Sequence, residues 1–245
     1  MPIELQAITI VAAGLFLAGV IKGATGLGYA SCALPFLVYA IGLKPAIGLV
    51  LAPAMATNVV LAFANGHLRE TCLGFAPLYA AMLPGIAAGM SLLLLVDTRI
   101  AVAALGVTII AYALFALATP GWRLSMRSVR ALQMPVGAIN GLVTGLTGSQ
   151  VMPLVPYFMA TGLDAPRTVQ AINLGVTLAS SAMLAGLIYS EAVAQPILAI
   201  SIAAIVPALA GVEVGQRLRG RLPEERIRTA ILVVLLLSGL GLLLR

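Results

Sequence analysis

Two short stretches decide how this chain folds: Lys22-Gly-Ala-Thr-Gly-Leu-Gly28 and, 122 positions later, Thr144-Gly-Leu-Thr-Gly-Ser-Gln150. Each one interrupts a long apolar stretch, residues 7–42 in the first case and 131–162 in the second. A continuous helix over the 36 residues of the first stretch would be about 54 Å long, whereas the hydrocarbon core of a bilayer is about 30 Å thick. We therefore expect each stretch to fold back at its glycines, as two short crossings or as a re-entrant hairpin.

The composition places the chain in a membrane. Of its 245 residues, 61% are hydrophobic and 9% are charged, and the mean hydropathy is +1.10. A soluble domain carries about 25% charged residues. The apolar runs of about 20 residues predict membrane-spanning helices, because a β-barrel shows shorter segments of alternating polarity. The predicted fold class is an all-α polytopic membrane protein.

Charge and cysteine usage exclude several other classes. The net charge of +6 comes mostly from arginines in short connectors, a distribution that orients a chain in the bilayer and is not typical of a nucleic-acid-binding surface. Cys32 and Cys72 form no CxxC pair and have no histidine nearby, so we expect neither a metal site nor a cofactor. The expected partners are the lipid bilayer and a small molecule, without nucleic acid.

The sequence contains an internal repeat. Three glycines recur 122 positions later and two prolines 121 positions later: Gly19, Gly23, Gly26, Pro35 and Pro45 correspond to Gly141, Gly145, Gly148, Pro156 and Pro166. We divide the chain into a first membrane repeat, 1–118, a cytoplasmic linker, 119–130, and a second membrane repeat, 131–245. Besides the fold-back pair, each repeat has three further helices, expected at 45–64, 72–96 and 99–118, and at 167–188, 195–217 and 227–244.

The repeats are expected to be inverted. A fold-back pair plus three helices crosses the membrane an odd number of times, so the second copy enters upside down. Positively charged residues favour cytoplasmic loops, and this topology puts ten of them on one face against three on the other, with both termini outside. The ten are Arg69, Arg123, Arg127, Arg130, Arg167, Arg217, Arg219, Arg221, Arg226 and Arg228, and the three are Lys44, Arg99 and Arg245.

The two breaks form the predicted substrate site. Interrupted helices free backbone N–H groups that need a partner in the membrane, and the helix after each break points the positive end of its dipole back at the break. A small anion fits such a site, and a dianion or other oxyanion gains most. The residues predicted to surround it are Lys22, Thr25, Gly26, Gly28, Asn58, Thr147, Gly148, Ser149, Gln150 and Asn173.

Structural roles compete with binding for several residues. Gly-xxx-Gly spacing lets membrane helices approach closely, and packing alone is expected for Gly85 with Gly89 and for Gly211 with Gly215. Asn58, Asn173 and the weaker candidate Asn140 could instead join helix to helix, and Lys22 could neutralise a helix end. Glu213 could relay a coupling proton, but an ion pair with Arg217, four residues on, is the favoured reading. His67 is expected to be a solvated loop residue.

The motifs resemble those of the sulfite exporter (TauE/SafE) family of membrane permeases. The resemblance rests on Gly19-Val-Ile-Lys-Gly-Ala-Thr-Gly-Leu-Gly28 with Pro35 and Gly42-Leu-Lys-Pro45, and on Gly141-Leu-Val-Thr-Gly-Leu-Thr-Gly148 with Pro156 and Gly162-Leu-Asp164. It differs after each break, where adjacent glycines are replaced by Gly-Leu-Gly-Tyr and Gly-Ser-Gln-Val. The resemblance implies a permease for sulfite, organosulfonates or related sulfur-containing anions, in a bacterial inner membrane.

The function expected from these features is secondary transport of a small anion by alternating access. An anion channel could use the same polar breaks, and a non-transporting scaffold or a membrane-embedded enzyme is the alternative from another class. An enzyme is disfavoured because the chain has no HExxH motif, no paired intramembrane carboxylates and a single histidine. The sequence leaves open the substrate, the direction of transport, the coupling proton or ion and the oligomeric state.

Overall fold

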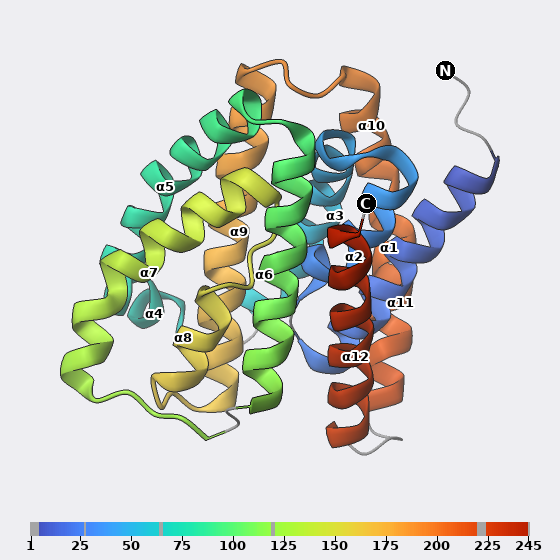
Figure 1. Cartoon of the computed structure of the whole chain (residues 1–245). Coiled ribbons are helices and arrows are strands. Elements are labelled where there is room, and N and C mark those ends of the chain that lie inside the picture. The colour runs from blue at the N-terminus through green and yellow to red at the C-terminus, as the bar shows by residue number, and fades with distance from the viewer. Residues whose placement is uncertain (1–4, 27, 64–65, 119–120, 220–223, 245) are drawn as a thin grey trace.

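The computed structural model describes residues 5–26, 28–63, 66–118, 121–219 and 224–244, and within these ranges all regular structure is helical (Figure 1). The all-α fold class is confirmed. The helices in chain order are α1 (Leu5–Thr25), α2 (Tyr29–Ile41), α3 (Leu43–Phe63), α4 (Leu68–Gly74), α5 (Ala76–Leu95), α6 (Thr98–Ala118), α7 (Met126–Thr147), α8 (Leu154–Ala160), α9 (Ala165–Tyr189), α10 (Gln195–Ala203), α11 (Ile205–Arg219) and α12 (Glu224–Leu243).

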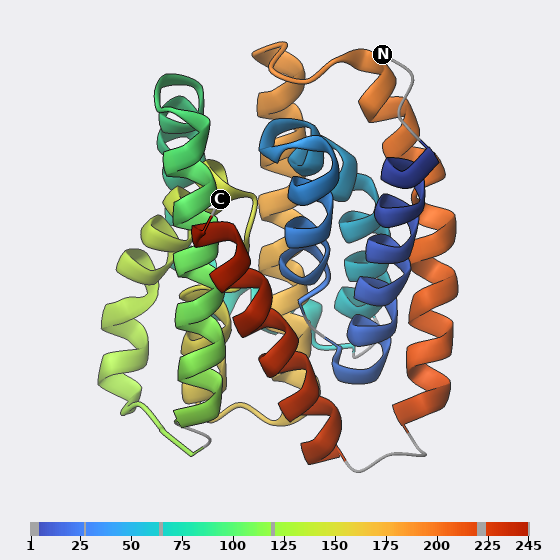
Figure 2. The same cartoon turned by 45° about the vertical axis from the view of Figure 1, so that its right-hand side comes forward.

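The helices follow one another in the same order in both halves. α1 to α6 correspond to α7 to α12, each half beginning with a broken pair. In Figures 1 and 2, α1, α3 and α6 run from the end where the N-terminus lies toward the opposite end, whereas α7, α9 and α12 run the other way. Inverted repeats would give this arrangement. How the repeats are oriented across a bilayer stays a prediction.

The two halves are interlaced. α1 packs along α11, and α5 packs along α7, so each close pair joins one helix from each half. α3 contacts α9 and α6 contacts α12 between the halves. If each helix is exchanged for its counterpart in the other half, the same four helix pairs result. This symmetry agrees with the repeat found in the sequence.

Glycines make the two close pairs. A Cβ at Gly23 of α1 would overlap the carbonyl oxygen of Val212, and one at Gly145 of α7 would overlap that of Ile86. Small residues at such points let helix backbones touch. The packing role expected for the Gly-xxx-Gly pairs of α5 and α11 is confirmed, because Cβ atoms at Gly85, Gly89, Gly211 and Gly215 would each overlap a carbonyl oxygen of the paired helix.

Two helices expected to be continuous are split. The predicted helix 72–96 is divided at Phe75 into α4 and α5, and 195–217 is divided at Ala204 into α10 and α11. Pro77 and Pro207 explain the divisions, because neither can donate a hydrogen bond to the carbonyl four residues earlier. α7 also begins at Met126, before the expected start at 131, because the side chain of Ser125 accepts a hydrogen bond from the Ser128 amide.

The described helices have the length and composition of membrane spans. Five segments are apolar and long enough to cross a bilayer: Ile8–Thr25, Ala76–Leu95, Thr98–Ala118, Ala165–Tyr189 and Gln195–Leu218. Shorter apolar helices cover Tyr29–Ile41, Leu43–Val59 and Thr229–Leu243. Large apolar side chains such as Leu95, Val107 and Val206 are more than half exposed, as expected for surfaces that face lipid. The chain is a polytopic membrane protein.

The arginine-bearing connectors gather at one end of the bundle. The connector before α7 and the one between α8 and α9 both lie at the end opposite the N-terminus in Figures 1 and 2. Arg167 forms an ion pair of 3.7 Å with Glu70, which joins the start of α9 to α4. The side chains of Arg219, Arg226 and Arg228 and the whole of Arg221 and Arg245 lie outside the described residues. That this end is cytoplasmic stays a prediction.

Candidate functional site

A buried lysine joins three helices at the centre of the molecule. Lys22, in the last turn of α1, is 2% exposed. Its Nζ donates hydrogen bonds to Oδ1 of Asn58 on α3 and, at 3.0 Å, to Oδ1 of Asn173 on α9. Asn58 and Asn173 are equally buried. Three residues predicted from their type and their place next to the breaks are therefore in direct contact, although Lys22 and Asn173 are 151 positions apart.

The lysine fixes the orientation of both amides. Because each Oδ1 accepts a hydrogen bond from Lys22 Nζ, each Nδ2 points away from Lys22 and is free to donate to another group. Asn173 Nδ2 donates to the carbonyl of Gly26 at 3.2 Å and to that of Val169 at 2.8 Å, so it ties the first break to α9. Asn58 Nδ2 is buried and has no hydrogen-bond partner. A buried amide donor without an acceptor is costly, and it marks a place where a ligand oxygen can bind.

Lys22 carries the only buried charge among the described side chains. The acids whose side chains are described, Glu70, Asp97, Asp164, Glu191 and Glu213, are all exposed. No ion pair among the described residues includes Lys22. A charge taken out of water without an opposite charge is expensive, and an anion beside it would offset that cost.

The first break is a tight turn made by two glycines. Gly26 has φ 80° and Gly28 has φ 82°, in the left-handed region that side chains disfavour. α1 therefore ends at Thr25 and α2 begins at Tyr29, with Gly28 as its N-cap. The fold-back predicted here is observed, but its arms have 21 and 13 residues and not about 15 each.

The second break is longer and is held by side chains of α7. Gly148 (φ 76°) ends α7, and α8 begins only at Leu154. Asn140 Nδ2 donates to the carbonyls of Gln150 at 3.3 Å and Met152 at 3.0 Å, and Thr144 Oγ1 donates to that of Ser149 at 3.2 Å. The expectation that a helix starts directly after each break is wrong here. α8 has seven residues and starts too late to aim its dipole at Ser149 and Gln150.

Side chains of the second break contact α2 and α9. Ser149 Oγ and Ser31 Oγ are 2.9 Å apart, a contact between the second break and α2. Gln150 Nε2 donates to Ser180 Oγ of α9 at 2.9 Å, and Gln150 Oε1 is buried without a partner. Both fold-back regions therefore contribute polar groups to one buried zone.

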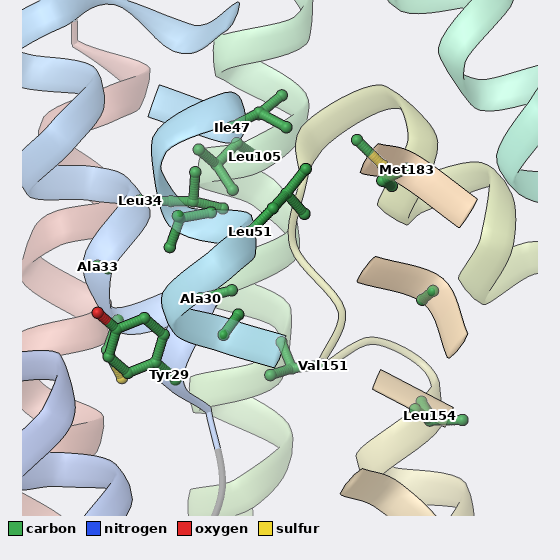
Figure 3. Packing of buried hydrophobic residues seen from close by; sticks show 14 of the residues in the cluster. Tyr29, Ala30, Ala33, Leu34, Ile47, Leu51, Leu105, Val151, Leu154 and Met183 are labelled. Carbon is green, nitrogen blue, oxygen red and sulfur yellow. The ribbon is translucent and has the colours of Figure 1, made fainter. Parts of the chain in front are cut away.

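This zone contains a cavity of about 20 Å³. Figure 3 shows three of its lining residues, Tyr29 and Ala30 at the start of α2 and Val151 on the segment between α7 and α8. The full lining is Gly28, Tyr29, Ala30, Ser31, Asn58, Gln150, Val151, Val155, Ile172, Asn173 and Val176. A cavity of this volume holds about one water molecule.

The ten predicted site residues take different places around the cavity. Four of them line it: Gly28, Asn58, Gln150 and Asn173. Lys22 and Gly26 are not in the lining but form hydrogen bonds with lining residues, Lys22 with Asn58 and Asn173, and Gly26 with Asn173. The other four residues make hydrogen bonds or packing contacts in or beside the two turns. Thr25 and Thr147 donate to carbonyls of their own helices, Gly148 packs beside Ile47, and Ser149 pairs with Ser31.

Glu213 and His67 lie away from this zone. Glu213 forms the expected ion pair with Arg217, at 3.0 Å, and both side chains are more than half exposed. His67 is exposed as expected, and it lies 3.5 Å from Glu70 and 3.5 Å from Arg167.

The comparison with protein families agrees with the architecture and the motifs. The sequence model of the family described as sulfite exporter TauE/SafE matches residues 11–242, which is nearly the whole chain. The chain belongs to the TauE/SafE family. No curated protein and no solved structure matches it significantly.

In this TauE/SafE protein, sequence reasoning missed part of the cavity wall. Tyr29 and Ser31 lie just after the first break, and their position on the arm that turns back could have identified them. Ile172 and Val176 gave no such signal, because apolar residues on a membrane helix look alike whether they face a cavity, another helix or lipid. Their role depends on how α9 is rotated, which contacts between the halves determine.

Proposed function

We propose that this TauE/SafE protein is a secondary transporter that carries a small sulfur-containing anion, such as sulfite or an organosulfonate, across the cell membrane by alternating access. The observation that carries the proposal is the uncompensated charge of Lys22, held by Asn58 and Asn173 beside a cavity of about 20 Å³. A bacterial inner membrane is the location that we propose with it.

An anion fits the chemistry of this site. Lys22 has two amide oxygens and no carboxylate as hydrogen-bond partners, so its charge is solvated but not neutralised. Asn58 Nδ2 adds a second donor without a partner. A small oxyanion would supply both the opposite charge and the missing acceptor.

The size of the cavity favours a carrier over a channel. A channel needs a continuous wet path, whereas here the polar groups surround a space for about one water molecule. Sulfite has four heavy atoms and needs more room than that. Binding must therefore move the surrounding helices, and a site that opens only by helix movement is what alternating access requires.

Catalysis is disfavoured by the surroundings of Lys22. Acid–base and nucleophilic mechanisms need a base within hydrogen-bond reach of the reacting group. The acids with described side chains are exposed, and His67 lies in a connector.

Flux into vesicles tests the proposal. Purified protein reconstituted into liposomes should take up labelled sulfite with saturation, and unlabelled sulfite inside should accelerate uptake by counterflow. Lys22→Ala should weaken apparent affinity about 10- to 100-fold, as for loss of a charge-assisted hydrogen bond. Lys44→Ala removes the only other lysine and serves as the control. Flux that rises linearly with concentration would indicate a channel, and no flux above empty liposomes would refute transport.

A further inference from the structure

The charges around the cavity are few enough to count. Lys22 contributes one positive charge, and Thr144 takes the corresponding position, 122 residues later, without a charge. The first break brings together the C-terminal end of α1 and the N-terminal end of α2, whose partial charges of about −0.5 and +0.5 largely offset each other. At the second break, α7 ends at Thr147 and adds about −0.5, which α8 does not offset because it is short and begins four residues after Gln150. The net charge at the site is therefore at most about +1.

We propose that this site is selective for singly charged oxyanions, such as hydrogen sulfite and monovalent sulfonates, and discriminates against dianions such as sulfate and fully deprotonated sulfite. The proposal rests on the proposed function, since it specifies the charge of the transported anion. It also reverses the expectation from the sequence that a dianion gains most, which assumed two opposed helix N-termini.

Charge balance is the physical reason. A monoanion beside Lys22 leaves a neutral pair in the interior, whereas a dianion leaves one negative charge without a partner. Among the described side chains no second cation lines the cavity, and the remaining lysine and the arginines are exposed or partly exposed. The protein interior screens charges poorly, so one uncompensated charge has a large effect on affinity.

The titratable groups packed around Lys22 do not change this count. Tyr29 and Cys32 of α2 are a phenol and a thiol, which add no positive charge. On α11, which packs along α1, Glu213 and Arg217 are exposed and paired with each other. The charged ends of α3 and α9, Lys44 and Arg167, are partly exposed to the surroundings.

The hydrogen-bonding groups match an oxyanion that keeps one proton. Asn58 Nδ2 is a donor without a partner, and its identity is fixed because Oδ1 accepts from Lys22. Gln150 lines the same cavity and has an acceptor, Oε1, without a partner. Hydrogen sulfite offers both oxygen acceptors and one O–H donor, whereas sulfonates and the sulfate and sulfite dianions offer acceptors alone. This match therefore favours hydrogen sulfite, and the selectivity for sulfonates over dianions rests on charge.

Binding of charge-matched probes tests the selectivity. The full-length protein in detergent would be titrated calorimetrically, at constant ionic strength, with methanesulfonate as the monoanion and sulfate as the dianion. We expect methanesulfonate to bind about 10- to 100-fold more tightly. On going from mildly alkaline to mildly acidic pH, sulfite, which gains a proton, should gain more affinity than methanesulfonate, whose own charge does not change. Equal or tighter binding of sulfate, or a gain for sulfite no larger than that for methanesulfonate, would overturn the selectivity but leave transport of an anion intact.

Two variants connect the selectivity to Lys22. Lys22→Gln should abolish the difference between methanesulfonate and sulfate, whereas Lys44→Gln should keep it. Asn58→Asp places a carboxylate beside Lys22 and should weaken methanesulfonate binding at least as much as Lys22→Gln does. Unchanged selectivity in a folded Lys22→Gln variant, judged by its melting temperature, would overturn the proposal. If neither probe nor sulfite bound to the wild type at either pH and vesicles showed no flux, the proposed function would fail together with the selectivity.

Discussion

Gly23→Ala should loosen the contact between α1 and α11 that holds Lys22 in place. A Cβ at position 23 would overlap the carbonyl oxygen of Val212 and would lie 2.9 Å from the Val212 carbonyl carbon and 3.0 Å from the Gln216 amide nitrogen. These are backbone atoms of α11, so no side-chain rotation relieves the overlap. Comfortable contacts between such atoms are about 3.5–4.0 Å. Because the overlapped carbonyl oxygen is closer than either of these atoms, the two helices must separate by about 1 Å or more.

The magnitude follows from this separation. A gap of about 1 Å forfeits about half of the dispersion energy of each contact across it, and overpacked sites in proteins cost about 1–3 kcal/mol. Alanine recovers up to about 1 kcal/mol through its higher helix propensity. We expect a net destabilisation of about 1–2 kcal/mol and, for a chain of this length, a melting temperature lower by roughly 2–8 °C.

Gly241→Ala is the matched control. Gly241 lies inside α12, and a Cβ there would have no neighbour within 4 Å. This substitution gains helix propensity without overlap, so the melting temperature should stay the same or rise. The assay is thermal unfolding of both variants and the wild type in one detergent, combined with sulfite uptake by liposomes, in which only Gly23→Ala should be impaired. Equal melting temperatures and uptake for the two variants would refute the close α1–α11 packing and its role in positioning Lys22.

Three further predictions address the topology and the polar groups. The first uses single cysteines that replace Arg123 or Glu191, in a chain whose Cys72 is changed to serine. A membrane-impermeant reagent should label the two positions from opposite sides of the membrane, as judged in inverted and right-side-out vesicles. Labelling of both from the same side would rule out the proposed topology. Glu213→Gln should leave transport unchanged and cost less than about 1 kcal/mol, because the ion pair is exposed; loss of proton-dependent uptake would instead favour a relay. Asn173→Leu should cost about 10- to 100-fold in sulfite affinity, since it removes an acceptor of Lys22 and releases Gly26, and wild-type affinity would place the site elsewhere.

The sequence contains enough information to place the breaks and to select the central polar residues. Length and hydropathy require a fold-back, and the glycines show where it occurs, because only glycine adopts the left-handed turn at Gly26 and Gly28 without strain. Lys22, Asn58 and Asn173 stand out because charged and amide side chains are expensive in a membrane interior without a partner.

The geometry of the second break could not be predicted in the same way. Its extended segment depends on Asn140 and Thr144, whose side chains bond carbonyls of residues 149, 150 and 152. Gly145 and Gly148 repeat Gly23 and Gly26, and Gln150 stands where the first half has Gly28. This pattern does not reveal that α7 supplies these donors or that α8 shrinks to seven residues. The charge of the site depends on this detail, since a later helix start removes a dipole from the pocket.

The glycine contacts also constrain how alternating access could proceed. α1 touches α11 and α5 touches α7 through backbone contacts at several glycines, so each pair is expected to move as one body. Each body contains one helix from each repeat, and the two repeats therefore cannot rock against each other as intact halves. Lys22 lies in the α1–α11 body, whereas Asn58 and Asn173 lie on α3 and α9, which contact each other at the centre. Because the hydrogen bonds of Lys22 join these parts, an anion that replaces the Asn58 or Asn173 bond would weaken the connection of α1–α11 to α3 and α9 at the moment of binding, while the bond from Asn173 to the Gly26 carbonyl and the contacts of α11 with α3 remain.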